Sequence, residues 1–336
     1  MGKSTLKDVA LEAGVGTATV ERVINGRGGV SYETAERVLR AAKKLKYGLR
    51  PAERLRGTIR IEVILTRPES EFFSRLAKAF ERIAASLDRS IVVHRTFVAE
   101  NDPAALALYI ENPSFRRSGL VIVSTRDRRV EASLAKVRAS GVEVVQVVTR
   151  CADPDIPYVG IDNYAAGRSA AFYLSRMLAS VEGSLVALCH SGAYDVHRSR
   201  MQGFSDYLAE HPDPSHDFPV VMLGLDDERR SEDLLYETLS KRKGIIGLYT
   251  AGGNNAVAAA VLKGCKLAGR VFWIGHELDD HTRALLKDGT MTVVLDQAPE
   301  VQARRSLDIV MKRLGLIEVE VSEEPVRFFT VTRESV

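Results

Sequence analysis

Apolar residues in the first 48 positions recur at the spacing of short helices. Three groups form one apolar face each: Val9, Ala10 and Ala13; Val20, Val23 and Ile24; and Ala35, Val38, Leu39, Ala42 and Leu45. Thr5 and Asp8 match the capping box that begins a helix, and Gly14 can end that helix. Ser31 is an N-cap candidate. The pattern predicts helices starting near Thr5, Gly16 and Ser31 that share one small core.

From residue 59 onward the pattern changes to apolar runs of strand length that alternate with amphipathic stretches. The runs are IRIEVILT, SIVVHRTFV, GLVIVST, VEVVQVV, GSLVALCH, FPVVMLG, GIIGLYT, RVFWIGH and MTVVLD. Helices are expected around residues 71–87, 128–139, 163–179, 197–210, 229–241, 253–263 and 299–313. This alternation predicts parallel sheets with right-handed crossovers, and the length suits two such sheets.

Length and composition fit a chain of several globular domains. The 336 residues exceed one usual core, 45% of them are hydrophobic, and no apolar run has the length of a membrane helix. The N-terminus lacks the apolar stretch of a secretory signal, so we expect a cytoplasmic protein. The three cysteines, Cys151, Cys189 and Cys265, are widely scattered and are expected to be reduced thiols.

Charge is distributed unevenly along the chain. Residues 1–57 hold twelve Lys and Arg against six Asp and Glu, whereas the rest is slightly acidic. A basic segment on an acidic body indicates a part that binds a polyanion. The alternative is a basic surface that is merely solvated.

The second predicted helix begins with small and polar residues after a glycine-containing turn. This arrangement is typical of a helix that enters the DNA major groove, because small residues let the backbone approach the base edges. Thr17 and Ala18 could contact base edges or a thymine methyl group, and Arg22 could reach guanine or a phosphate. The alternative is a three-helix docking domain whose second helix faces solvent.

Residues 5–56 carry the motifs of a known family at their usual spacing. They are Asp8-Val9-Ala10, Ala13-Gly14-Val15, Thr19-Val20-Glu21-Arg22-Val23-Ile24-Asn25, Val30-Ser31, Tyr47 and Ala52-Glu53-Arg54-Leu55. With these motifs the segment resembles the headpiece of the LacI/GalR family of transcriptional regulators, the lactose- and purine-repressor type. Gly16 and Glu21 depart from the family pattern, in which Ser is common at both positions.

The resemblance implies an all-α helix-turn-helix headpiece over residues 1–48 and a hinge helix over residues 49–58 that folds on the operator. The implied DNA contacts are Thr5, Thr17, Ala18, Thr19, Arg22, Asn25, Ser31, Tyr47, Ala52 and Leu55. Leu55 would open a central base step from the minor groove, together with the same residue of a second subunit. A plain basic linker is the alternative for the hinge.

Residues 59–336 resemble the effector-binding and dimerisation domain of this family. The implied fold is an α/β two-lobed periplasmic-binding-protein-like (type I) domain with doubly wound parallel sheets. One expected lobe holds about residues 60–161 plus 292–316, and the other holds residues 162–291 plus 317–336. The expected effector between the lobes is a sugar, with a nucleobase or a sugar phosphate as the alternative.

Ligands of open α/β sheets bind beyond the carboxyl ends of the strands. Position after a strand selects Phe72, Phe73 and Arg126 as candidate effector residues. The resemblance to the family implies the further candidates Asp162, Arg198, Arg200, Asn254, Glu277 and Gln297. Phe72 and Phe73 resemble an aromatic pair that stacks on a sugar, although either ring could belong to the core. One of Arg198 and Arg200 is expected to bind the ligand, and Arg126 could instead lie in a plain surface turn.

Other chemistries have little support in the sequence. The two histidines of HELDDH, residues 276–281, lie about 140° apart around a helix, so no metal site is expected. Gly252-Gly253 lacks the Gly-Lys-Ser/Thr of a nucleotide loop, and no nucleophile elbow or catalytic triad pattern is present. We therefore expect neither a cofactor nor an enzyme.

The sequence thus predicts a transcriptional regulator, a repressor that binds pseudo-palindromic operator DNA as a homodimer and responds to a small carbohydrate. A solute-binding protein for transport and a carbohydrate-modifying enzyme are the alternatives from other classes.

Overall fold

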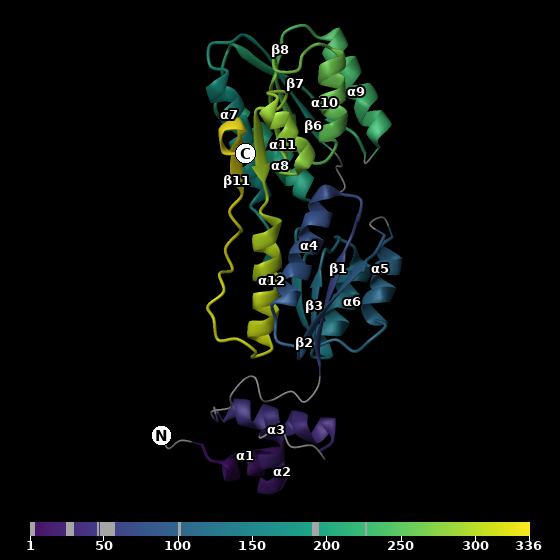
Figure 1. The fold of residues 1–336 in the computed structure, drawn as a ribbon, viewed down its shortest axis with the longest axis vertical. Coiled ribbons are helices and arrows are strands. Elements are labelled where there is room, and N and C mark those ends of the chain that lie inside the picture. The colour runs from purple at the N-terminus through teal and green to yellow at the C-terminus, as the bar shows by residue number, and fades with distance from the viewer. Residues whose placement is uncertain are drawn as a thin grey trace.

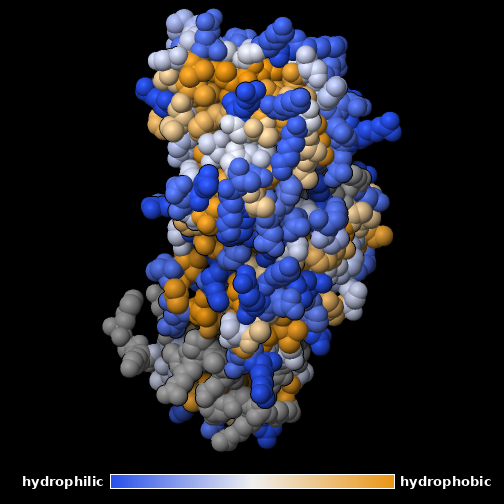
Figure 2. All heavy atoms as spheres, turned by 45° about the horizontal axis from the view of Figure 1, so that its top comes forward, coloured by the Kyte–Doolittle hydropathy of each residue, from blue (hydrophilic) through white to orange (hydrophobic). Residues whose placement is uncertain are grey.

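The computed structural model describes residues 4–24, 30–45, 47, 58–99, 102–189, 195–225 and 227–336. These residues form a small helical headpiece and two α/β lobes, which follow one another along the long axis of the molecule (Figure 1). None of the helices in these ranges has both the length and the apolar character needed to span a membrane. One face is largely hydrophilic, with apolar patches that include one near the end formed by the second lobe (Figure 2).

The headpiece consists of α1 (Leu6–Ala13), α2 (Thr17–Ile24) and α3 (Tyr32–Lys44). The capping box of Thr5 and Asp8 begins α1, and Gly14 ends it in the left-handed conformation with a φ of 64°. Apolar side chains from all three helices form one core, in which Val9, Val20 and Val38 are completely buried. The three helices predicted from the apolar spacing are confirmed.

The first lobe is built on a parallel five-stranded sheet of order β2-β1-β3-β4-β5. Its strands are β1 (Ile59–Leu65), β2 (Ile91–Phe97), β3 (Gly119–Ile122), β4 (Glu143–Val147) and β5 (Tyr158–Val159). One face packs against α4 (Glu71–Ala85) and α12 (Pro299–Arg313), and the other against α5 (Pro103–Glu111) and α6 (Arg128–Ala139). The central strands β1 and β3 are buried on both faces, as expected of a parallel sheet, whereas the edge strand β2 is partly exposed.

The second lobe is built on a six-stranded sheet of order β11-β10-β9-β8-β6-β7, in which only the edge strand β11 is antiparallel among the described strands. The strands are β6 (Gly183–Cys189), β7 (His216–Leu223), β8 (Ile245–Thr250), β9 (Phe272–His276), β10 (Val293–Asp296) and β11 (Phe329–Thr332). The helices are α7 (Asn163–Met177), α8 (Asp195–Glu210), α9 (Glu228–Lys241), α10 (Asn255–Gly264) and α11 (Asp280–Lys287), followed by the 3-10 turn η2 (Arg333–Ser335). Helices α7 and α8 cover one face, and α9, α10 and α11 cover the other.

The expected boundary between the lobes needs correction within residues 292–316. Strand β10 pairs in parallel with β9 and therefore belongs to the second sheet, whereas α12 packs against α4 and β4 of the first lobe. The apolar run of β10 identified a buried strand, but it carried no information about which sheet would accept it. The C-terminal segment also differs from expectation, because Val326 bridges to Ile161 beside the first lobe before β11 joins the second sheet.

Helices α7 and α8 approach each other so closely that there is no room for a side chain at Gly167 or Gly203, where they meet. A Cβ atom on Gly167 would overlap the carbonyl oxygen of Arg200, and one on Gly203 would overlap that of Tyr164. The two glycines thus let the backbones touch, which brings the beginning of α8 against the beginning of α7. This contact positions Arg200 beside Asn163.

Candidate DNA-binding helix and effector site

Helix α2 presents a polar face to solvent and an apolar face to the headpiece core. Thr17, Ala18 and Arg22 are exposed, Thr19 is half-buried, and Val20 is buried. The exposed N-terminal residues of α2 are small and are followed by one arginine, as expected of a helix that enters the DNA major groove. Glu21 is exposed on the same helix, so a negative charge lies close to any DNA phosphates that this face contacts.

Other residues that are predicted to contact DNA form hydrogen bonds or pack within the headpiece. The Thr5 hydroxyl donates to Asp8 Oδ2 at 2.7 Å, and the Ser31 hydroxyl accepts from the Thr34 amide at 3.3 Å. Tyr47 is half-buried against the headpiece core. Their DNA contacts remain predictions. Three further candidates, Asn25, Ala52 and Leu55, lie outside the described residues.

The carboxyl ends of the two sheets face each other, and the loops and helix starts that follow them make direct contacts. Arg75 of α4 donates to the carbonyl oxygen of Leu278, which follows β9, at 2.6 Å and to Oδ1 of Asp296, the last residue of β10, at 2.7 Å. It also binds Glu300 of α12 at 3.0 Å. We call residues 66–75, 124–127, 195–200, 276–278 and 296–300 the interlobe region.

A second contact between the lobes centres on Asp195, the first residue of α8. Its carboxylate pairs with Arg126, which follows β3 of the first lobe, and with Arg198 one turn further along α8. Both arginine side chains remain more than half exposed. The sequence indicates the two arginines but not Asp195, because an acidic residue in the first turn of a helix is common and carries no specific signal.

Arg200 is buried and holds three segments together. Its Nε donates to Asn163 Oδ1 at 2.8 Å, and its Nη1 donates to the carbonyl oxygen of Ala251 at 3.1 Å. Asn163 begins α7 and Ala251 follows β8, so the guanidinium connects α8 with the carboxyl edge of the second sheet. The sequence does not distinguish Arg198 from Arg200 as the ligand-binding arginine. In the structure Arg200 is buried and Arg198 is exposed.

Glu277 directly follows β9 and has a left-handed backbone with a φ of 72°. Its Oε1 accepts a hydrogen bond from Gln297, whereas Oε2 is shielded from solvent and has no hydrogen-bond partner among the described residues. Burial raises the pKa of this carboxyl from the usual 4.5 to about 7, with the Arg200 charge opposing that rise. Such a carboxyl can exchange a proton near neutral pH.

Buried polar atoms without a hydrogen-bond partner collect in the interlobe region. Within the described chain they include Oγ1 of Thr66 and Thr125 at the first sheet, and Nδ1 of His276 and Oε2 of Glu277 at the second. Burial holds the pKa of His276 well below its usual range, so this imidazole is neutral. Unsatisfied polar atoms are costly in a folded protein, and their concentration here indicates a place where a polar ligand supplies the missing bonds.

The remaining effector candidates each make contacts within one lobe. Phe72 and Phe73 pack edge to face at 5.3 Å within the core of the first lobe, and both are buried. Asp162 accepts a hydrogen bond from the Ala165 amide as the N-cap of α7. The Asn254 amide donates to Ser231 of α9 at 2.8 Å, so its side chain is directed away from the interlobe arginines.

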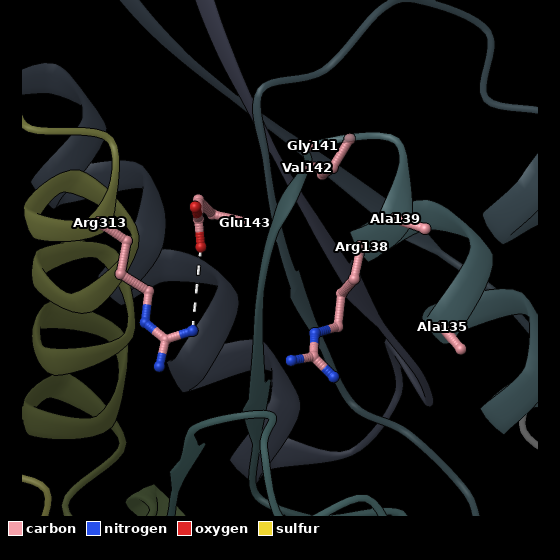
Figure 3. A pocket seen from close by; sticks show the side chains of 7 residues that line it. All are labelled: Ala135, Arg138, Ala139, Gly141, Val142, Glu143 and Arg313. Atoms are coloured by element: carbon pink, nitrogen blue, oxygen red, sulfur yellow. Dashed lines mark ion pairs between the residues drawn. The ribbon is translucent and has the colours of Figure 1, made fainter. Parts of the chain in front are cut away.

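Surface hollows occur away from these residues. One of about 450 Å³ lies at the turn between α6 and β4 and is lined by Arg138, Glu143 and Arg313 together with small apolar residues (Figure 3). Arg313 of α12 pairs with Glu143 at 3.8 Å. This hollow is at the amino end of β4, opposite the interlobe region, and contains none of the predicted effector residues. Within the described part of the chain, no group of three or more His, Cys, Asp or Glu is arranged to hold a metal ion.

Comparisons with known proteins match both parts of the chain. Residues 5–48 match the model of the bacterial regulatory proteins of the lacI family, and residues 61–315 match the model of a periplasmic binding protein domain. Catabolite control protein A of Streptococcus mutans is 26% identical over 334 residues, covering 94% of either chain. Catabolite control protein A of Staphylococcus epidermidis is 28% identical over 215 residues, covering 62% of either chain.

A solved structure shares the fold of the two lobes. It is an ABC transporter periplasmic solute binding protein from Actinobacillus succinogenes with bound D-allose, similar with a TM-score of 0.73 and 18% identity. The match covers 82% of this chain and 98% of that one. At this identity the similarity establishes the two-lobed fold.

Proposed function

The chain belongs to the lacI family of bacterial regulatory proteins and carries a periplasmic binding protein domain, and on this premise we propose that it represses transcription under effector control. The headpiece reads operator DNA, and a small molecule bound between the lobes changes the affinity of the protein for that DNA. The unsatisfied polar atoms of the interlobe region carry the proposal, since they lie on both lobes and are available to a ligand that contacts both.

A sugar is the effector that this chemistry favours. Thr66, Thr125 and Glu277 offer hydrogen-bonding oxygens, and sugar hydroxyl groups both donate and accept. The D-allose bound by the solute binding protein of the same fold supports this choice. A nucleobase presents fewer donors to the same set of groups and is the second candidate.

The working form that we propose is a cytoplasmic homodimer on a pseudo-palindromic operator. One three-helix headpiece reads about half of such a site, and two headpieces read its symmetric halves. The dimer links the effector site to DNA because a change in the relative position of the lobes changes the spacing of the headpieces. By thermodynamic reciprocity, operator DNA then changes the affinity for the effector by the same factor.

The test is operator binding by the full-length purified protein to its own upstream intergenic DNA, at stated salt, with and without a panel of sugars. We expect sequence-specific binding that weakens with salt and that one sugar changes by at least about tenfold. Anisotropy of a labelled duplex measures this, with a scrambled duplex as control. Absence of specific binding at every salt concentration would leave the headpiece a docking domain and favour a solute-binding role.

A further inference from the structure

The described arginines of the interlobe region are already engaged by the protein. Arg75 binds Asp296 and Glu300, while Arg126 and Arg198 share the carboxylate of Asp195. Arg200 differs, because it donates to uncharged oxygens of Asn163 and Ala251. The region also holds Arg67, which pairs with Glu69 at 3.9 Å. The four arginines other than Arg200 thus each pair with at least one nearby carboxylate.

In contrast to the paired arginines, some buried hydrogen-bonding atoms of the interlobe region have no partner among the described residues. Glu277 Oε2 is enclosed and has no hydrogen-bond partner among the residues that the structure describes. The same holds for Nδ1 of the preceding residue, His276. An ionised carboxylate can only accept hydrogen bonds, so it attracts a ligand that donates and repels a ligand that carries negative charge. Asp296 is also buried nearby, but its carboxylate is paired with Arg75.

We propose that Asp195 is a specificity-determining residue that makes the effector site reject anionic ligands such as sugar phosphates and accept neutral polyhydroxylated ones. Asp195 occupies two guanidinium groups, one from each lobe, that would otherwise be suited to binding a phosphate or carboxylate group. This inference rests on the proposed function, because it concerns the charge of the effector.

Replacing Asp195 by Asn removes the negative charge and keeps the size of the side chain. The two arginines then repel each other and have no carboxylate partner at that position, so an anion can bridge them from the exposed side. Both guanidiniums are more than half exposed and therefore within reach of a ligand in solution. The variant is expected to bind anions more tightly than the wild-type protein does.

The experiment compares wild-type protein, Asp195→Asn and a matched control, Asp206→Asn, by calorimetric titration with inorganic phosphate and with glucose 6-phosphate. Asp206 lies on the same helix and binds Tyr164 and Gln202, so its replacement makes the same charge change away from the arginine pair. We expect Asp195→Asn to bind either anion about tenfold more tightly than the other two proteins. The double variant Asp195→Asn with Arg126→Gln should lose this gain.

Equal anion affinity of wild type and Asp195→Asn would overturn the proposal, as would a gain that survives removal of Arg126. Asp195→Ser provides the same test if the Asn variant does not fold, which circular dichroism reveals. The readout is independent of the proposed function, because it needs neither operator DNA nor the natural effector. Failure of the wild-type protein to bind its operator would refute the regulator and leave this result standing.

Discussion

The carboxyl group of Glu277 makes the stability of the folded protein depend on pH. Its pKa is raised to about 7 because the side chain is enclosed between the lobes, although Gln297 donates one hydrogen bond to it. A carboxyl whose pKa is higher in the folded than in the unfolded protein retains its proton more tightly when folded. The stability that this confers is complete below pH 4.5 and is lost as the pH rises through about 7.

Glu277→Gln should therefore remove a pH dependence of stability. We expect the free energy of unfolding of the wild-type protein to fall, relative to the variant, by about 3 kcal/mol between pH 4.5 and 7.5. Urea denaturation followed by fluorescence of Trp273, the single tryptophan of the chain, measures this. Parallel stability curves for the two proteins would show that Glu277 titrates normally.

Single residues also show how far the sequence could identify the site. Arg126 was chosen because it follows a strand of an open sheet, and Arg198 because it matches the family's helix start; both lie in the interlobe region. The pairing of Arg126 with Asp195 and the contacts of Arg75 were not predictable, since each joins residues that are distant in the chain. Phe72 and Phe73 were placed correctly on a helix start, but sequence alone cannot tell a stacking ring from a core ring.

At the scale of elements, the contact between α7 and α8 depends on two glycines that face the partner backbone. Gly203 lies on α8 against Tyr164, and Gly167 lies on α7 against Arg200. A methyl group at either position must push the helices apart. That movement also displaces Arg200 from Asn163.

Gly203→Ala should destabilise the protein by about 1–3 kcal/mol through overpacking of this contact. Gly264→Ala is the matched control, because it also replaces a helical glycine but meets no atom within 4 Å. The control should be neutral or slightly more stable, since alanine favours a helix. Thermal denaturation of both variants checks the difference, and an equal midpoint for the two would contradict backbone contact at Gly203.

Elements were predicted where the apolar spacing was regular and missed where it was not. The strand runs and the long amphipathic helices were found, whereas α5, which is apolar on all sides, and the short polar α11 were overlooked. The two-residue strand β5 gives no periodic signal at all. The assignment of β10 to the first lobe failed because spacing reveals burial but not the identity of the neighbouring strand.

For the whole molecule, the relative position of the lobes depends on side chains that reach across the interface. Arg75 is the strongest case, with bonds to Leu278, Asp296 and Glu300. Because its stem belongs to α4 of the first lobe and two of its acceptors to the second, it opposes separation of the lobes. Arg82 lies on the same helix but pairs at 3.7 Å with Glu300, a residue of the same lobe.

Arg75→Ala should loosen the lobes, whereas Arg82→Ala should not. We expect a larger radius of gyration by small-angle X-ray scattering for Arg75→Ala, because the charges of Asp296 and Glu300 lose their common partner and repel each other. Hydrogen exchange at residues 276–278 should also become faster. Identical scattering curves for the two variants would show that Arg75 does not hold the lobes.

The chain returns to the first lobe only in α12, so the order in which the elements are synthesised differs from the order in which they pack. Helix α12 covers one face of the first sheet, yet it is synthesised after strands β6 to β10 of the second lobe. On the ribosome, the face of the first sheet that α4 and α12 share is therefore only partly covered until residues 299–313 have emerged, while the headpiece can close its own core at once. Nascent chains of this protein should need chaperone protection during that interval, and slower translation would prolong it.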